Sequence, residues 1–256
     1  MPYIEINSVR CYYSQRNGTG TPILFCHGSG GGHHHWLFQL KNLPDSLEPI
    51  AVDLPGHGRS EGPPASNIET YRDWLHQFTE SLKLKDFLLA GHSMGGAIAM
   101  AYAMKYPDHV LGLVLIGTGC RLKVLPELLS SLKKETMPAD FIQYLYGENA
   151  SDELLNRARE ELTATNPVLL YSDLSACNNF NITDKLALIM QPSLVICGSK
   201  DLLTPVKYSR FLSDKLPRGE IDIITDAGHM AMIEKPDEVN NSIVLFHNKL
   251  HNSGEY

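Results

Sequence analysis

A serine between two glycines, at the point where an apolar run meets a helical segment, constrains this chain more than any other feature. Residues 87–90 read Phe-Leu-Leu-Ala, residues 91–95 read Gly-His-Ser-Met-Gly, and residues 96–101 continue as an alanine-rich helical segment. Small residues at a strand-to-helix junction permit a tight turn that pushes the central side chain out of the sheet. We therefore expect the hydroxyl of Ser93 to lie at the end of a buried strand, where it is a candidate nucleophile.

Apolar runs alternate with helical patterns along most of the chain. Strands are expected at residues 22–26, 49–52, 87–90, 110–116, 193–197 and 221–224, and a hairpin at residues 3–6 and 9–13. Alternating strands and helices are typical of a parallel sheet covered by helices. The alternation lapses between residues 118 and 190, where only helical patterns appear. The sequence therefore predicts an α/β core made of residues 1–117 and 191–256, with residues 118–190 inserted as a helical unit.

Two helix starts carry capping signals. Ser66 is followed three residues later by Glu69, which is the pattern of a capping box, and Ser151 precedes a helical segment of the insertion. Side-chain oxygens at such positions accept hydrogen bonds from the first free N–H groups of a helix. We therefore expect helices to begin just after Ser66 and just after Ser151.

Two further strand ends carry the partners that a serine nucleophile needs. Asp201 follows the strand at residues 193–197, and His229 follows the strand at residues 221–224. The carboxyl ends of parallel strands lie at one edge of a sheet, so Ser93, Asp201 and His229 are expected to converge there. A serine hydroxyl needs a base to take its proton, and the base needs an acid to orient it. These three residues are therefore predicted to form a catalytic triad.

An anion site and a pocket are expected beside the triad. A tetrahedral intermediate needs two N–H donors, and the backbone N–H groups of Ser29 and Met94 are the candidates. Ser29 lies in a glycine-rich loop after the first buried strand, and Met94 begins the helix after the serine. The predicted lining of the substrate pocket consists of Trp36, Phe141, Tyr144 and Met230.

Two other readings of the glycine- and histidine-rich segment are rejected. The loop at residues 28–32 resembles a dinucleotide loop, but the last glycine of that pattern falls on His33, so no nicotinamide cofactor is expected. Residues 33–35 are three histidines, which diverge around a helix or strand and have no carboxylate neighbour at useful spacing. We therefore expect no metal site there, and the triad requires no cofactor.

Composition excludes several classes of protein. The net charge is −7 without a cluster of Lys or Arg, so a nucleic-acid partner is not expected. No apolar run approaches the roughly 20 residues that span a membrane, and the first residues lack the pattern of a signal peptide. The five cysteines have no paired spacing, which favours free thiols. A cytoplasmic protein without a membrane partner is expected.

Five segments together resemble the α/β-hydrolase superfamily. They are residues 27–30 (His-Gly-Ser-Gly), 53–60 (Asp-Leu-Pro-Gly-His-Gly-Arg-Ser), 91–96, 198–201 (Gly-Ser-Lys-Asp) and 228–229 (Gly-His). The resemblance extends from the first hairpin to the last helix. It implies a mostly parallel eight-stranded sheet with helices on both faces, a helical cap between the sixth and seventh strands, and a lid of residues 118–190 over Ser93. A serine at position 93 separates the chain from haloalkane dehalogenases and epoxide hydrolases of this fold, whose nucleophile is an aspartate.

The expected activity is cofactor-free hydrolysis of a small carboxylic ester through an acyl-enzyme on Ser93. Two alternatives stay open. The loop at residues 27–30 resembles that of carbon–carbon bond hydrolases, which act on diketone-type substrates with the same triad. The second alternative is a small-molecule receptor on the same fold, in which hydrolysis is slow. The acyl chain, the leaving group, and whether the protein is a monomer or a homodimer are open at this point.

Overall fold

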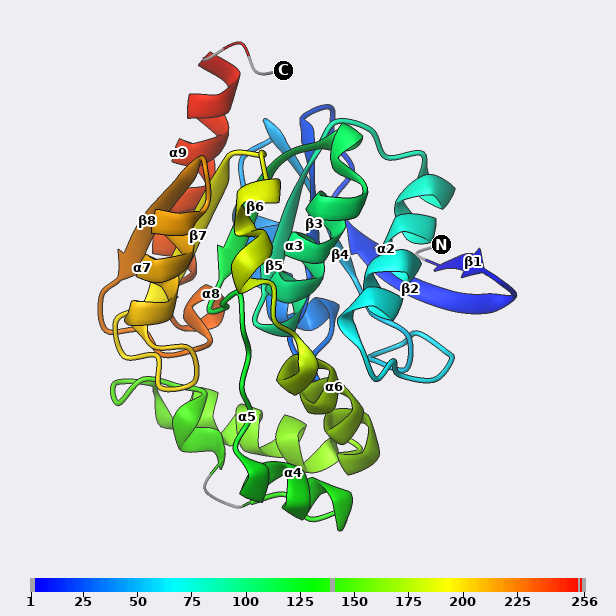
Figure 1. The fold of residues 1–256 in the computed structure, drawn as a ribbon, viewed down its shortest axis with the longest axis vertical. Coiled ribbons are helices and arrows are strands. Elements are labelled where there is room, and N and C mark those ends of the chain that lie inside the picture. The colour runs from blue at the N-terminus through cyan, green and yellow to red at the C-terminus, as the bar shows by residue number, and fades with distance from the viewer. Residues whose placement is uncertain (1–2, 139–140, 253, 255–256) are drawn as a thin grey trace.

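One sheet of eight strands runs through the part of the chain that the computed structural model describes, residues 3–138, 141–252 and 254 (Figure 1). Its strand order is β1-β2-β4-β3-β5-β6-β7-β8. The strands are β1 (Tyr3–Ile6), β2 (Val9–Gln15), β3 (Thr21–Cys26), β4 (Leu47–Val52), β5 (Phe87–His92), β6 (Val110–Ile116), β7 (Ser193–Gly198) and β8 (Gly219–Ile224).

The sheet is antiparallel at one edge and parallel elsewhere. β1 pairs with β2 as the predicted hairpin, and its turn residues Asn7 and Ser8 have φ angles of 51° and 65°. β2 is antiparallel to β4, whereas every pair from β4 through β8 is parallel. Parallel strands bring their carboxyl ends to one edge, so the loops after β3, β5, β7 and β8 share that edge. The predicted α/β class and its mostly parallel sheet are confirmed.

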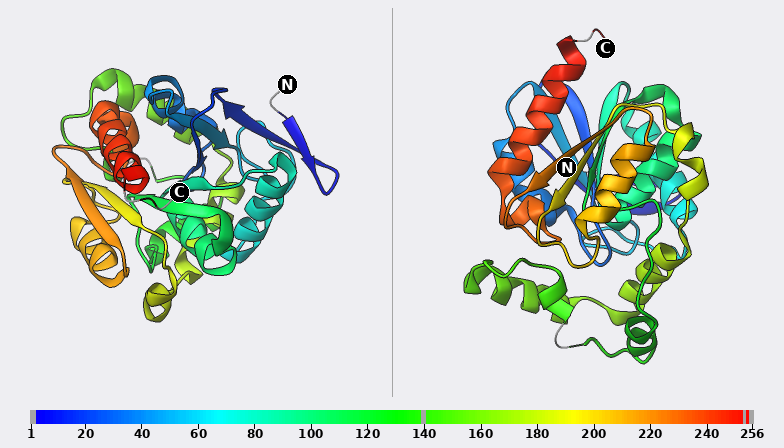
Figure 2. Two further views of the ribbon diagram at one scale, coloured as in Figure 1. Left: turned by 90° about the horizontal axis from the view of Figure 1, so that it is seen from above. Right: turned by 60° about the vertical axis from the view of Figure 1, so that its left-hand side comes forward.

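Helices cover both faces of the sheet because its central strands are apolar on both faces. In β3, Leu24 and Cys26 belong to the apolar cluster that includes residues of α2, α3 and α7, whereas Ile23 and Phe25 belong to the second cluster, with residues of α1, α8 and α9. The right-hand view of Figure 2 shows α9 on one side of the sheet and α3 and α7 on the other. The core elements are η1 (His33–Trp36), α1 (Leu37–Asn42), α2 (Ile68–Leu82), α3 (Met94–Lys105), η2 (Pro107–His109), α7 (Val206–Lys215), α8 (Ala231–Glu234) and α9 (Pro236–Asn252).

The chain between β6 and β7 carries helices and, in its described residues, no strand of the sheet. Most of these helices lie together at one end of the molecule, below the sheet in Figure 1, and we call them the cap. They are α4 (Pro126–Lys133), η3 (Phe141–Tyr144), α5 (Asp152–Ala164) and α6 (Pro167–Asn179). The short helix η4 (Thr183–Leu188) instead lies beside the sheet and contacts α7.

One capping prediction is wrong and the other is confirmed. Asn67, not Ser66, caps α2, and its Oδ1 accepts a hydrogen bond from the Thr70 N–H at 2.8 Å. Asparagine and serine are equally good caps, so the Ser66 pattern shifted the expected start by one residue. Ser151 caps α5 and accepts from the Leu154 N–H at 3.3 Å.

Two expectations from composition can be compared with the structure. All five cysteines are buried free thiols, as their spacing indicates. In residues 3–138, 141–252 and 254, no helix is both long enough and apolar enough to cross a membrane.

A buried carboxylate fastens the cap to the core. Asp173 of α6 is fully buried and accepts hydrogen bonds from the Gly30 N–H at 2.8 Å and the Tyr71 hydroxyl at 2.6 Å. The Nε2 atom of His57 lies 2.7 Å from the same carboxylate. The cap is therefore held to the glycine-rich loop, to α2 and to the loop after β4 by one side chain.

The pairing of His57 with Asp173 predicts a pH dependence of stability. Burial alone would lower the pKa of His57, but the hydrogen bond and the charge of Asp173 outweigh it and raise this pKa above its usual value of 6.5. A raised pKa in the folded state stabilises the fold fully below pH 6.5, and this stabilisation is lost as the pH rises through the folded pKa.

The stability difference between the wild type and His57→Gln should therefore be largest near pH 6 and shrink toward pH 9, because glutamine does not titrate. Urea unfolding at several pH values measures the difference. A difference that stays constant across this range would contradict a charged His57.

Candidate active site

The turn at residues 91–95, which we call the serine turn, has the strained backbone that its two glycines permit. Ser93 has φ 52° and ψ −113° and immediately precedes α3. Its N–H donates to the Ile116 carbonyl at 2.9 Å, which fixes the turn to β6. A methyl group on Gly91 would overlap the backbone of Gly95, and one on Gly95 would overlap the backbone of Cys26. Both glycines are therefore required by close backbone packing, and the turn holds Ser93 at the carboxyl end of β5.

The predicted base and acid are in direct contact. The Nδ1 atom of His229 lies 2.9 Å from Oδ2 of Asp201, and both side chains are buried. Asp201 also accepts hydrogen bonds from the Thr204 hydroxyl at 2.7 Å and from the N–H groups of Leu203 and Thr204 at 2.9 and 2.8 Å. These contacts orient the carboxylate toward the imidazole.

The charge state of Asp201 suits an orienting acid. Burial alone would raise the pKa of Asp201, but the charge of His229 and the hydrogen bonds from His229 and Thr204 outweigh burial and lower this pKa to about 2. Asp201 is therefore ionised at neutral pH and accepts the proton on His229 Nδ1. That tautomer leaves Nε2 of His229 with a lone pair, as a general base requires.

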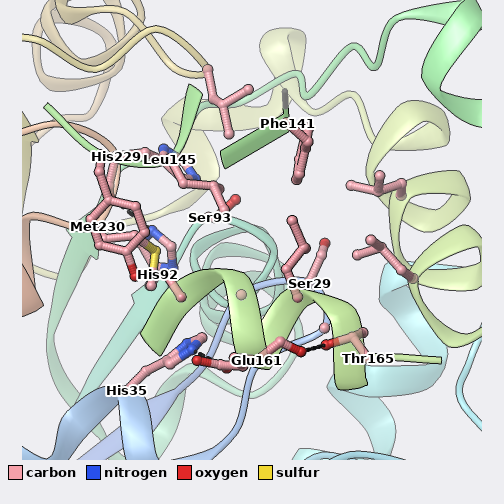
Figure 3. Close-up of a pocket in the computed structure, with 18 residues that line it drawn as sticks. Ser29, His35, His92, Ser93, Phe141, Leu145, Glu161, Thr165, His229 and Met230 are labelled. Atoms are coloured by element: carbon pink, nitrogen blue, oxygen red, sulfur yellow. Dashed lines mark hydrogen bonds and ion pairs between the residues drawn. The ribbon is translucent and has the colours of Figure 1, made fainter. Parts of the chain in front are cut away.

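Ser93 and His229 line the same cavity, between the carboxyl edge of the sheet and the cap (Figure 3). Its volume is about 90 Å³. The core contributes Gly28, Ser29, Gly30, His35, His92, Ser93, Leu203, His229 and Met230, and the cap contributes Phe141, Leu145, Tyr146, Ala158, Glu161, Leu162, Thr165, Leu170 and Leu174. The cap side of the cavity is thus mainly apolar apart from Tyr146, Glu161 and Thr165, and the core side carries Ser93 and the histidines.

The four residues predicted to line the pocket divide into two pairs. Phe141 and Met230 line the cavity that contains Ser93. Trp36 does not, because η1 turns its side chain toward the sheet, where it is fully buried with its ring 4.7 Å from that of Phe25. Tyr144 lies in η3, three residues after Phe141, and is also absent from the lining.

The two segments predicted to supply the oxyanion donors are neighbours. The Ser29 hydroxyl lies 3.7 Å from the sulfur of Met94, so the loop after β3 runs beside the start of α3. A methyl group on Gly28 would come within 3.2 Å of Ser93 Cβ. Small residues in this loop therefore allow the backbone to approach Ser93 closely.

His92 supports His229 from below the turn. Its Nε2 atom lies 3.0 Å from the carbonyl oxygen of His229, and the two rings are 4.6 Å apart. Burial, followed by the charge of His229, holds the pKa of His92 well below its usual value. A neutral His92 with its proton on Nε2 therefore donates to the backbone of His229.

Gly117, directly after β6, leaves the space that the His229–Asp201 pair occupies. Its φ is +53°, and a methyl group there would lie 3.3 Å from His229 Nδ1 and 3.4 Å from Asp201 Oδ2. Gly117→Ala should therefore destabilise the fold by about 1–2 kcal/mol through backbone strain and lower kcat by displacing the pair. Urea unfolding and steady-state kinetics measure the two effects.

Gly62→Ala is the matched control, because Gly62 also has a positive φ, +89°, and its added methyl group would contact Val9 instead of His229 and Asp201. This variant should lose stability and keep kcat. An equal loss of kcat in both variants would show that strain alone, not the packing of Gly117 on the pair, lowers activity.

The three consecutive histidines have no carboxylate at useful spacing in the sequence, but each contacts a carboxylate from a distant part of the chain. His33 Nδ1 lies 3.0 Å from Asp53, and the Nε2 atoms of His34 and His35 lie 2.6 and 2.7 Å from Glu161 of the cap. Glu161 follows His35 by 126 residues, so no local spacing could reveal this contact.

Comparisons with known proteins agree with this fold. The acetyltransferase component of the acetoin cleaving system of Pseudomonas putida is 27% identical over 89% of this chain, which spans 63% of that relative's length. A thermophilic esterase of known structure is 31% identical, covers 97% of both chains and has a TM-score of 0.85. The structure of Est816, an N-acyl homoserine lactone degrading enzyme, is 27% identical and also has a TM-score of 0.85. The match covers 96% of this chain and 100% of Est816.

The family model described as the alpha/beta hydrolase family matches residues 23–242. That range contains Ser93, the cap, Asp201 and His229. It also contains the strands β4 to β8 of the sheet. The chain therefore belongs to the alpha/beta hydrolase family.

Proposed function

We propose that this protein hydrolyses carboxylic esters through an acyl-enzyme on Ser93. The observation that carries the proposal is the His229–Asp201 contact of 2.9 Å beside a strained serine turn, with Ser93 and His229 lining one cavity. The similarity to a thermophilic esterase and to a lactone-degrading enzyme supports an ester substrate, because a lactone is a cyclic ester.

The proposed first half-reaction forms the acyl-enzyme. Nε2 of His229 takes the proton from the Ser93 hydroxyl as the oxygen attacks the ester carbonyl. Ionised Asp201 stabilises the resulting imidazolium through Nδ1. The imidazolium then returns its proton to the alcohol oxygen, the carbon–oxygen bond of the ester breaks, and the alcohol leaves.

The second half-reaction repeats these steps with water. His229 removes a proton from water, the hydroxide adds to the acyl carbon, and the Ser93 oxygen leaves with the proton that His229 returns. In both halves the backbone N–H groups of Ser29 and Met94 are proposed to hold the oxyanion. Their supporting feature is that the Ser29 loop lies against Met94, whose N–H begins α3 at the positive end of the helix dipole.

The size and lining of the cavity favour a substrate with a short apolar acyl group. Its volume is about 90 Å³, and its cap side carries leucines and Phe141. An apolar group on the substrate gains free energy by leaving water for such a lining. A long acyl chain exceeds the cavity and must remain outside it.

A substrate panel tests the proposal. p-Nitrophenyl acetate, butyrate and palmitate should be hydrolysed with kcat/KM highest for the short chains, and a vinylogous diketone should react slowly. Faster cleavage of the diketone would identify a carbon–carbon bond hydrolase instead. Turnover well below about 1 per second on every compound, outside the usual enzyme range, would favour a receptor.

A further inference from the structure

Three potential metal ligands from distant parts of the chain meet between core and cap. The Nε2 atoms of His34 and His35, both in η1, lie 2.6 and 2.7 Å from one oxygen of Glu161 in α5. All three ligand atoms lie within 4.8 Å of one another. Figure 3 shows His35 and Glu161 pointing toward each other at one end of the cavity. None of these groups has a role in the proposed hydrolysis.

The glycine-rich loop lets two consecutive histidines point the same way. Their rings are 4.6 Å apart and inclined by 66°. A methyl group on Gly31 would come within 2.6 Å of His35 Nδ1, and one on Gly32 within 2.9 Å of His34 Nδ1. Each ring therefore packs against the backbone of a glycine, where any larger residue would clash with it. The Nε2 atoms of both rings face Glu161. The two glycines thus allow the Nε2 atoms of consecutive histidines to point at one carboxylate, whereas consecutive side chains usually diverge.

We propose that His34, His35 and Glu161 bind a divalent transition-metal ion, with Zn²⁺ as the best match. Two imidazole nitrogens and one carboxylate oxygen are a common zinc ligand set, whereas Ca²⁺ and Mg²⁺ prefer oxygen ligands alone. Ligands about 2.0–2.2 Å from zinc at tetrahedral angles stand about 3.3 Å apart. The observed separations of 2.6 to 4.8 Å bracket that value, so small side-chain movements complete the site.

An ion can reach this position. His34, His35 and Glu161 all line a second, larger cavity of about 710 Å³ on the outer side of the cluster. Three protein ligands leave a fourth position for water, as in open zinc sites. A bound ion links η1 of the core to α5 of the cap.

The ion-free cluster is a different chemical state. The one Glu161 oxygen accepts from both rings, so each Nε2 carries a proton in that state. A metal ion takes the place of the proton on each Nε2, and each neutral ring then carries its one proton on Nδ1, so metal binding requires both rings to change tautomer.

Titration of the protein with ZnCl₂ after dialysis against EDTA tests the site. We expect saturable binding of one ion per chain and a rise in Tm of about 5–10 °C at one hundred times Kd. Glu161→Gln and His34→Gln should each abolish the Tm rise. Glu160→Gln, an exposed neighbour on the same helix, should keep it.

Titration with CoCl₂ makes the test independent of stability, since tetrahedral Co²⁺ bound to nitrogen and oxygen absorbs visible light. The wild type and Glu160→Gln should develop this absorption, and His34→Gln, which replaces a half-buried ligand, should not. The proposal is overturned if the wild type binds no stoichiometric Zn²⁺. It is also overturned if His34→Gln and Glu161→Gln bind Zn²⁺ as tightly as the wild type, since other histidines would then hold the ion.

Discussion

Replacing Ser93 with alanine is expected to remove ester hydrolysis while the fold stays intact. Loss of the nucleophile of a serine hydrolase costs about 10⁴–10⁶ in kcat, and what remains comes from binding and the oxyanion donors. Alanine keeps a Cβ atom, so the strain at φ 52° and the surrounding packing are unchanged. The Tm should therefore stay within a few degrees of the wild-type value.

The measurement is kcat/KM for p-nitrophenyl butyrate, together with Tm by circular dichroism. Ser130→Ala is the matched control, because Ser130 is an exposed serine on α4, away from the cavity lining. It should hydrolyse the ester at the wild-type rate. If Ser93→Ala retained a tenth of the wild-type activity, another group would have to be the nucleophile.

Replacing Asp173 with asparagine is expected to cause the largest loss of stability. Three donors, from Gly30, His57 and Tyr71, point at its two fully buried oxygens. An asparagine has one acceptor oxygen, so its NH₂ group must face at least one of these donors, and His57 loses its counter-charge. Removing one partner of a buried pair costs about 3–5 kcal/mol.

Urea unfolding measures this loss, and Asp214→Asn, an exposed carboxylate on α7, should stay within about 0.5 kcal/mol of the wild type. Activity should fall as well, because Asp173 holds the N–H of Gly30, the residue after the proposed oxyanion donor Ser29. A loss below about 1 kcal/mol for Asp173→Asn would mean that the cap is held mainly by its apolar contacts.

The placement of Ser93, Asp201 and His229 was predictable because two simple regularities apply. Apolar runs locate the strands of a parallel sheet, and the residues after those strands meet at one edge. The 2.9 Å contact between His229 and Asp201 follows from adjacent parallel strands, β7 and β8. No detail of the helices was needed for this prediction.

The cap was not predictable in the same way, since its contacts depend on how separate helices pack. Asp173 meets His57 across 116 residues, and Glu161 meets His35 across 126 residues. A helical pattern indicates which side of a helix is apolar, but it does not indicate which partner that side meets. The same limit explains why Phe141 lines the cavity while Tyr144, on the next turn of the same segment, does not.

Trp36 illustrates a further limit of local reasoning. Its position beside the glycine-rich loop indicated a pocket residue, but the short helix η1 rotates the ring onto Phe25 in the core. A large aromatic residue near a motif contributes more free energy by complete burial than at the rim of a pocket. The buried position of Trp36 also fixes η1, which carries His34 and His35.

Trapping the acyl-enzyme tests the proposed chemistry most directly. The wild type is mixed with p-nitrophenyl butyrate, quenched in acid within the first turnover, and examined by intact-mass spectrometry and peptide mapping. We predict one butyryl group per chain, on the peptide that contains Ser93, and none on Ser93→Ala. Ester turnover without an adduct, or an adduct that persists in Ser93→Ala, would contradict an acyl-enzyme on Ser93.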